Sequence, residues 1–308
     1  MQQGKKLKKG DTIGLISPAG PEDPKAIRKG IEFLKSLGFN VKEGKHLYDK
    51  EKYLAGSDID RAKDLMNMFK DKDVNMVLCV RGGYGTMRIL PLLDFDIIKK
   101  NPKIFMGFSD ITTLLNMIAQ KSNIITFHGP MGSSSLDEKY TLESFLNILT
   151  QCRGDFTIDN PKDFDIKEEV SGYAEGEIIG GNLCLICSTL GTPYEIDFKN
   201  KILFIEEIGE APYKIDRMLT QLLLSNKLQE CSGFILGQFK GCQLSNYERS
   251  FKLDEVISDR ILSLGKPTLS NLMSGHDYPK LTIPIGCKCL LDTYNKSIKI
   301  IEPVVSEN

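Results

Sequence analysis

The chain has 308 residues, of which 41% are hydrophobic and 26% are charged, and its formal net charge is -1. This length suits two domains of ordinary size, and the near-neutral charge gives no electrostatic reason to expect a nucleic-acid partner. No stretch approaches the roughly 18 apolar residues of a membrane span, and no apolar run follows the basic residues 5–9, so we expect neither a membrane helix nor a secretory signal.

The first half of the chain alternates strands and helices. Short strands are predicted at residues 12–16, 40–42, 75–80, 103–107 and 124–127. Apolar residues at helical spacing and capping residues predict helices at 23–37, 58–69, 111–120 and 140–151. This alternation predicts an open, mostly parallel α/β sheet of the flavodoxin-like or Rossmann-like type, with its working loops at the carboxyl ends of the strands.

The pattern changes after Leu136, where residues 155–167 are polar and contain few apolar positions. Further elements are predicted as strands at 201–205 and 234–237, helices at 213–224 and 255–264, and paired strands between 283 and 301 with a turn at Asn295. We therefore predict an N-terminal α/β domain at 1–152, a linker at 153–169 and a smaller α+β, barrel-like C-terminal domain at 170–308.

The eight cysteines could suggest a disulfide framework or, through Cys184 and Cys187 in a CxxC pair, a zinc site. Most of them fall inside apolar runs, and the CxxC pair lies in a helix-like run without the turn residues of a zinc knuckle. We expect buried free thiols, no metal and a reducing, cytoplasmic compartment.

Ser109, in the sequence Gly107-Phe108-Ser109-Asp110, falls at the turn between a predicted strand and a predicted helix. A serine there has its hydroxyl at the edge of the sheet beside free helix N–H groups, which is where a nucleophile is needed. Gly82-Gly83 follows the predicted strand at 75–80 and suits either an oxyanion hole or a tight turn. It lacks the GxGxxG spacing, and no Walker Lys-Ser/Thr pair follows it, so a nucleotide loop is not indicated.

A nucleophilic serine needs a base, and the chain has three histidines. His46 lies in a polar segment that is typical of the surface. His128 follows a strand in the same predicted domain as Ser109, and His276 lies in a small-residue loop of the kind that often presents catalytic groups. Sequence position alone does not decide whether His128 or His276 is the base. The carboxylates that could orient the base are clustered after one strand: Glu206, Glu207 and Glu210.

Several motifs, in order along nearly the whole chain, together resemble the LD-carboxypeptidases of serine peptidase family S66, which also includes the microcin C self-immunity peptidases. These motifs are Arg81-Gly82-Gly83-Tyr84-Gly85 and residues 93–94, 101–112, 180–183, 191–194, 203–207, 212–219, 275–276 and 281–286.

The resemblance implies a Ser-His-Glu triad split between the two domains, with Ser109 as nucleophile, His276 as base and Glu206 as the orienting carboxylate. It also implies an oxyanion hole made by the backbone N–H groups of Gly83 and Asp110. Spacing alone does not separate Glu206 from its two neighbouring glutamates. The substrate is then expected in a cleft between the domains.

Two residues near these motifs remain as candidates for contacting substrate. They are Arg81, which suits a substrate carboxylate, and His128.

For function, the resemblance implies release of terminal D-alanine from murein tetrapeptides by hydrolysis of an L-D peptide bond, during cell-wall recycling in the cytoplasm. It implies a homodimer without metal or cofactor. One alternative is a self-immunity peptidase that cleaves aminoacyl-nucleotide conjugates. The absence of Trp and the pattern around Tyr213 favour the carboxypeptidase over it. A non-catalytic small-ligand-binding module is the alternative from another class.

Overall fold

The computed structural model describes residues 1–134 and 136–307. The chain folds into two compact units. The first unit contains residues 1–154, 281–286 and the C-terminal segment from Pro303, and the second contains residues 155–280 and 287–302.

The first unit is built on a six-stranded sheet with the order β12-β5-β4-β3-β1-β2. Its strands are β1 (Thr12–Ile16), β2 (Asn40–Glu43), β3 (Val74–Cys79), β4 (Ile104–Gly107), β5 (Thr126–His128) and β12 (Ile283–Ile285). The first five pair in parallel, and β12 adds an antiparallel edge with Ile283 opposite His128. The predicted open, mostly parallel α/β sheet is confirmed.

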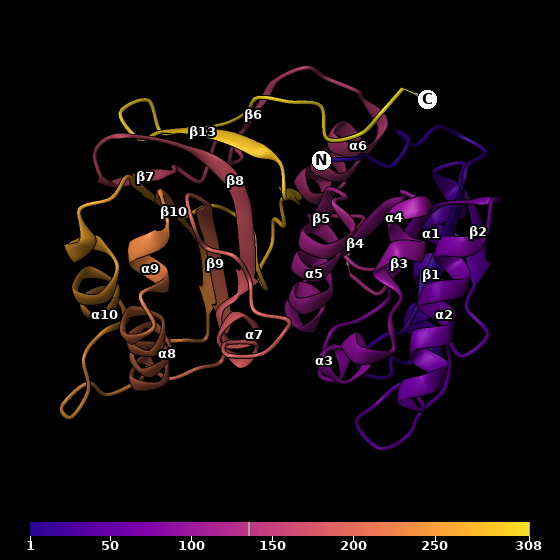
Figure 1. Ribbon diagram of the computed structural model, residues 1–308, viewed down its shortest axis with the longest axis horizontal. Helices are drawn as coiled ribbons and strands as arrows, with labels where there is room; N and C mark the ends of the chain where they lie inside the picture. The colour runs from indigo at the N-terminus through magenta and orange to yellow at the C-terminus, as the bar shows by residue number, and fades with distance from the viewer. Residues whose placement is uncertain (135, 308) are drawn as a thin grey trace. The chain divides into compact units, whose positions relative to one another are not determined.

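Helices flank this sheet (Figure 1). They are α1 (Pro24–Ser36), α2 (Asp58–Lys70), α3 (Thr86–Ile89), α4 (Phe95–Lys100), α5 (Thr112–Ser122) and α6 (Lys139–Thr150), with 3-10 turns η1 (Leu90–Leu92) and η2 (Ser109–Ile111). Asp23 and Ser57 cap α1 and α2 by accepting bonds from backbone N–H groups of the first turn. Helix α1 packs on β2, α2 on β1 and β3, and α5 on β4 and β5.

The second unit contains an eight-stranded mixed sheet with the order β6-β14-β13-β8-β9-β10-β11-β7. Its strands are β6 (Phe156–Ile158), β7 (Lys167–Val170), β8 (Tyr173–Asn182), β9 (Ile202–Ile208), β10 (Gly233–Lys240), β11 (Thr268–Ser270), β13 (Lys288–Asp292) and β14 (Ser297–Ile300). Strands β8 to β11 are parallel, and the others join antiparallel. The predicted linker, residues 153–169, contains β6 and the start of β7, which form the two edges of this sheet.

The helices of the second unit are α7 (Leu183–Ser188), α8 (Pro212–Leu224), α9 (Lys227–Glu230) and α10 (Leu253–Arg260), with the 3-10 turn η3 (Leu262–Leu264). Helix α7 packs on β8 and β9, and α8 packs against α7, α9 and α10. Across residues 1–134 and 136–307, no helix combines the length and the apolar character needed to cross a bilayer.

Candidate active site

Ser109 lies in η2, between the end of β4 and the start of α5. Its φ angle is +63°, in the left-handed region that non-glycine residues adopt only where the surrounding structure imposes it. Gly107 permits the tight turn, because a Cβ there would lie 2.8 Å from a side-chain carbon of Ile111. This strained strand-to-helix turn is the geometry that presents a nucleophilic hydroxyl.

Asp110, next to Ser109, stabilises the turn through hydrogen bonds with Thr86. Its buried carboxylate accepts a hydrogen bond from the backbone N–H of Thr86 at 2.9 Å, and its carbonyl oxygen accepts one from the Thr86 hydroxyl at 2.6 Å. Burial raises the pKa of the Asp110 carboxyl, against the hydrogen bonds from Thr86. The side chain of Asp110 is thus occupied in holding the serine turn against the start of α3.

The glycine pair after β3 lies directly against the serine. A Cβ on Gly82 would lie 2.9 Å from Ser109 Cβ and 3.1 Å from its Oγ. Gly83 has a φ of +108°, and the Gly82 carbonyl accepts a hydrogen bond from the Gly20 N–H at 3.0 Å. The loops after β1, β3 and β4 therefore meet at the carboxyl edge of the parallel sheet, where α/β proteins bind ligands.

In the second unit, His276 and Glu206 form a close pair, with 2.6 Å between His276 Nδ1 and Glu206 Oε2. The Glu206 side chain is fully buried, and 11% of the His276 side chain is exposed. A carboxylate oxygen accepts, so Nδ1 of His276 donates to Glu206, and in a neutral imidazole Nε2 is then the acceptor nitrogen. A histidine paired in this way with a carboxylate can act as a general base.

The prediction that Glu206 directly follows its strand is wrong, because the residue lies inside β9, opposite Asn182 of β8. The apolar run ends at Ile205, but pairing with β10 continues through Glu207 and Ile208. Backbone pairing thus extends the strand beyond its apolar residues and buries Glu206 more deeply than a loop position would.

The other two glutamates have different partners. Glu207 accepts hydrogen bonds from the Asn182 side chain and from the Cys184 and Ile208 backbone N–H groups, each at 2.8 Å. Burial raises the pKa of the Glu207 carboxyl. Glu210 pairs with Lys214 at 2.8 Å. Of these three carboxylates, Glu206 is the one that contacts a histidine.

Sequence reasoning missed Lys280, which is almost fully buried beside this pair. Its Nζ donates to the Gly275 carbonyl and lies 3.5 Å from the Asp277 carbonyl, so it holds the backbone on both sides of His276. Burial lowers the pKa of Lys280 to about 8, against the attraction of Glu206. A lysine in a polar loop is usually solvated, so the sequence carries no signal for this role.

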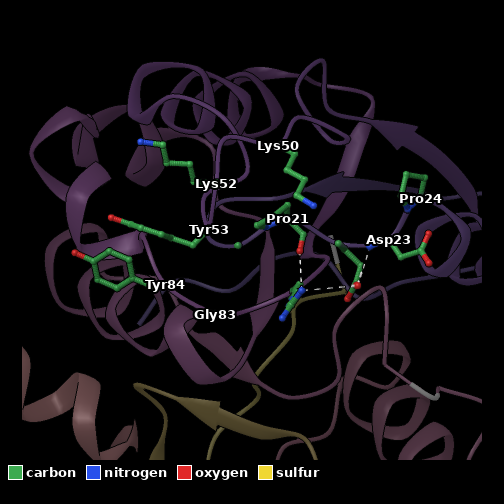
Figure 2. Close-up of a pocket in the computed structure, with 11 residues that line it drawn as sticks. Pro21, Asp23, Pro24, Lys50, Lys52, Tyr53, Gly83 and Tyr84 are labelled. Carbon is green, nitrogen blue, oxygen red and sulfur yellow. Dashed lines mark hydrogen bonds and ion pairs between the residues drawn. The ribbon is translucent and has the colours of Figure 1, made fainter.

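His128 and Arg81 occupy different environments in the first unit. His128 is fully buried, with its ring edge-on to Phe108 at a centroid distance of 5.9 Å. Arg81 is exposed; its Nη1 donates to the Pro21 carbonyl at 2.7 Å and lies 4.0 Å from a Glu22 oxygen. Arg81 and Gly83 line a cavity of about 920 Å³ (Figure 2).

All eight cysteines are free thiols, and six of them are buried. Cys184 and Cys187 both lie on α7, and the Cys187 thiol is directed to the Met218 carbonyl at 3.5 Å. Within the part of the chain that the structure describes, no group of three or more His, Cys, Asp and Glu side chains could hold a metal ion.

Comparisons with known proteins agree over both units. Residues 13–129 match the model of the LD-carboxypeptidase N-terminal domain, and residues 175–291 match that of the LD-carboxypeptidase C-terminal domain. The chain is 45% identical over 307 residues to a probable murein peptide carboxypeptidase of Bacillus subtilis, covering 98% of this chain and 95% of that protein.

Two solved structures are also similar. The microcin C7 self-immunity protein MccF in complex with glutamyl sulfamoyl guanosine is 29% identical, with a TM-score of 0.92 over 99% of this chain and 100% of that one. A muramoyltetrapeptide carboxypeptidase of Oxalobacter formigenes is 30% identical, with a TM-score of 0.82 over 94% of this chain and 97% of that one.

Proposed function

The chain belongs to the LD-carboxypeptidase family, peptidase S66, and we propose that it is a serine carboxypeptidase that releases terminal D-alanine from murein tetrapeptides. The family resemblance predicted from the motifs is confirmed, and the chain is a peptidase. The observation that carries the proposed chemistry is the 2.6 Å contact between His276 and the buried Glu206. The proposal includes a cytoplasmic homodimer that acts in cell-wall recycling without metal or cofactor.

In the proposed mechanism, Ser109 Oγ attacks the carbonyl of the L-D peptide bond while His276 Nε2 takes its proton. The backbone N–H groups of Gly83 and Asp110 donate to the oxyanion. His276 then gives the proton to the amine of D-alanine, and the same histidine activates the water that hydrolyses the acyl-enzyme. The mechanism requires His276 to come within hydrogen-bond reach of Ser109 in the active enzyme.

Glu206 is suited to support this cycle because its carboxylate is removed from water. A charge in a low-dielectric site interacts more strongly with the imidazolium that forms on His276 than an exposed charge would. Glu206 also holds the histidine in the tautomer whose Nε2 can accept a proton. The full burial of His128 favours a supporting role behind the Ser109 turn, rather than direct contact with substrate.

A self-immunity peptidase is the second candidate function, because the fold of this chain matches that of MccF with a TM-score of 0.92. The 45% identity to a murein peptide carboxypeptidase over almost the whole chain supports the murein substrate more strongly. A binding module without catalysis would have no need of a buried carboxylate held against a histidine.

The test is to incubate the purified protein with a murein tetrapeptide or with an aminoacyl sulfamoyl nucleotide, and to follow both by mass spectrometry. We expect free D-alanine from the tetrapeptide and a loss of at least about 1000-fold in Ser109→Ala. His276→Ala should lose as much, and His128→Ala should lose less. Ser36→Ala, which changes an exposed serine of the same unit, is the control.

Cleavage of the nucleotide conjugate alone would favour the self-immunity function. No cleavage of either compound, or equal D-alanine release by Ser109→Ala, would refute the proposed activity. Equal losses in the two histidine variants would reopen the choice of base.

A further inference from the structure

The cavity beside Arg81 and Gly83 belongs entirely to the first unit and has a volume of about 920 Å³. Besides these two residues, its lining includes Lys50, Lys52, Tyr53 and Tyr84. Small-molecule sites in proteins usually measure about 300–1,000 Å³, so this space is large enough to take a peptide.

The cavity adjoins the proposed nucleophile. Gly83, one of the proposed oxyanion donors, forms part of its wall, and the neighbouring Gly82 lies against Ser109. A substrate whose scissile carbonyl sits between Ser109 and Gly83 would therefore have one end at the mouth of this cavity. The leaving D-alanine would fill only a small part of the volume, so the space fits the longer, acyl half of a peptide.

The charges on the lining favour an anionic ligand. The lining carries three basic side chains, Lys50, Lys52 and Arg81, against two acidic ones, Glu22 and Asp23, so its formal charge is positive. Both carboxylates also accept a backbone hydrogen bond at 2.8 Å, Glu22 from the Asp23 N–H and Asp23 from the Lys25 N–H. Among residues 1–134 and 136–307, no carboxylate pairs with Lys50 or Lys52. Two ammonium groups are thus available to a ligand.

The aromatic part of the lining is open to a ligand as well. The ring centroids of Tyr53 and Tyr84 are 5.9 Å apart, and the ring planes are inclined at 57°. The exposed fraction is 61% for Tyr53 and 47% for Tyr84. Figure 2 shows the two rings next to each other on one side of the cavity, with Lys52 above them and Lys50 farther away, near Pro21. Such a surface can cover the apolar stems and backbone of a peptide while the lysines bind its carboxylates.

The loop that carries Lys50, Lys52 and Tyr53 has a fixed backbone. Glu51 and Leu54 exchange two backbone hydrogen bonds of 2.8 and 2.9 Å, and the Ala55 N–H donates to the Ala19 carbonyl at 2.9 Å. Lys52, at the tip of this turn, has a φ of +56°. A lysine here replaces the glycine or asparagine that this conformation favours, and strain of this kind is concentrated at functional sites.

We propose that this cavity is the acyl-side subsite, in which Lys50 and Lys52 bind carboxylates of an anionic peptide and Tyr53 and Tyr84 cover its backbone. The inference rests on the proposed function, because it takes Ser109 as the nucleophile. It makes the net negative charge of the acyl half a determinant of specificity.

The test compares wild-type protein with Lys50→Met/Lys52→Met on the murein tetrapeptide and on its form with amidated acyl-side carboxylates. We expect the double variant to raise KM for the tetrapeptide about tenfold, the scale of two partly exposed charge contacts, with little change in kcat. The amidated peptide should be bound weakly by both proteins. Lys99→Met/Lys100→Met, which removes two exposed lysines of α4, is the matched control.

Binding to Ser109→Ala, measured by calorimetry with the tetrapeptide and with adenosine monophosphate, separates this inference from the proposed activity. Tetrapeptide binding that weakens in the lysine variant supports the subsite even if wild type cleaves nothing. Cleavage with an unchanged KM in Lys50→Met/Lys52→Met overturns the subsite and leaves the activity intact. Lysine-dependent binding of the nucleotide but not of the peptide, or no binding of either, also overturns it.

Discussion

The serine turn of the first unit and the His276–Glu206 pair of the second are held in place by different means. Ser109 is positioned by the backbone: its own left-handed φ and the close-packed Gly82 and Gly107. His276 is positioned by side chains, because Glu206 binds its ring and Lys280 binds the carbonyls beside it. The turn at Gly107 and Ser109 is encoded in a few adjacent residues, with Gly82 packed on it from the loop after β3, whereas the buried charges come from strands and loops far apart in sequence.

The largest predicted effect is a loss of kcat, and it should distinguish Glu206 from the adjacent Glu207. Glu206→Gln should lower kcat by about 1000-fold or more without unfolding the protein, because the neutral amide stabilises the imidazolium poorly and can favour the wrong tautomer. The kcat for D-alanine release and the melting temperature of each variant, measured side by side, test this expectation.

Glu207→Gln is the matched control. Whichever way its amide turns, the NH2 group faces a backbone N–H of Cys184 or Ile208, so unfolding should become easier by about 1–3 kcal/mol. Activity at low temperature should remain close to that of wild type. The reverse pattern would make Glu207 the orienting acid.

A smaller effect on kcat is expected where the backbone positions Ser109, the proposed nucleophile. In Gly82→Ala, the added methyl would meet Ser109 Cβ at 2.9 Å, so the serine or the glycine loop must shift. A displacement of this order should reduce kcat by about 100-fold. Gly154→Ala is the control, since a Cβ there meets nothing within 4 Å. Wild-type kinetics in Gly82→Ala would show that the close packing of the loop is not needed.

The contrast between the two regions also explains how much the sequence could predict. The strand, turn and helix around Ser109 are consecutive, so their order along the chain indicated the serine turn, and the alternation of strands and helices indicated the sheet. Strand β12 has only three residues, and nothing local indicates that it pairs with β5 rather than with its neighbour β13.

Long-range contacts limited what could be predicted for the second unit. The choice among three glutamates depends on which carboxylate the His276 loop approaches, and spacing does not encode that. Lys280 resembles any lysine of a polar loop until the fold buries it. Sequence patterns therefore identify groups positioned by their own neighbours better than groups positioned by tertiary packing.

The smallest effect concerns two buried lysines, one in each unit. Burial lowers the pKa of Lys280 and of Lys103 from the ordinary 10.5 to about 8. Below pH 8 each lysine is protonated both in the folded protein and in the unfolded chain, and burial of the charge costs stability. Between about pH 8 and 10.5 the unfolded chain holds the extra proton, so the stability of the folded protein rises with pH. Lys280→Met and Lys103→Met should each remove part of this rise in urea unfolding.

Activity should distinguish these two lysines. Lys280 faces Glu206, Lys240 and Asp277 and holds the His276 loop, whereas Lys103 donates to the Asp71 and Val74 carbonyls of the first unit.

Loss of the Lys280 charge weakens its hold on the loop, so wild-type kcat should fall above about pH 8. Lys280→Met should be about tenfold slower at pH 7 and show no such fall, since its loop lacks the anchor at every pH. Lys103→Met should keep the wild-type pH profile. The same change of profile in both variants would mean that the fall does not come from the His276 loop, and the proposal that side chains position His276 as the base would be contradicted.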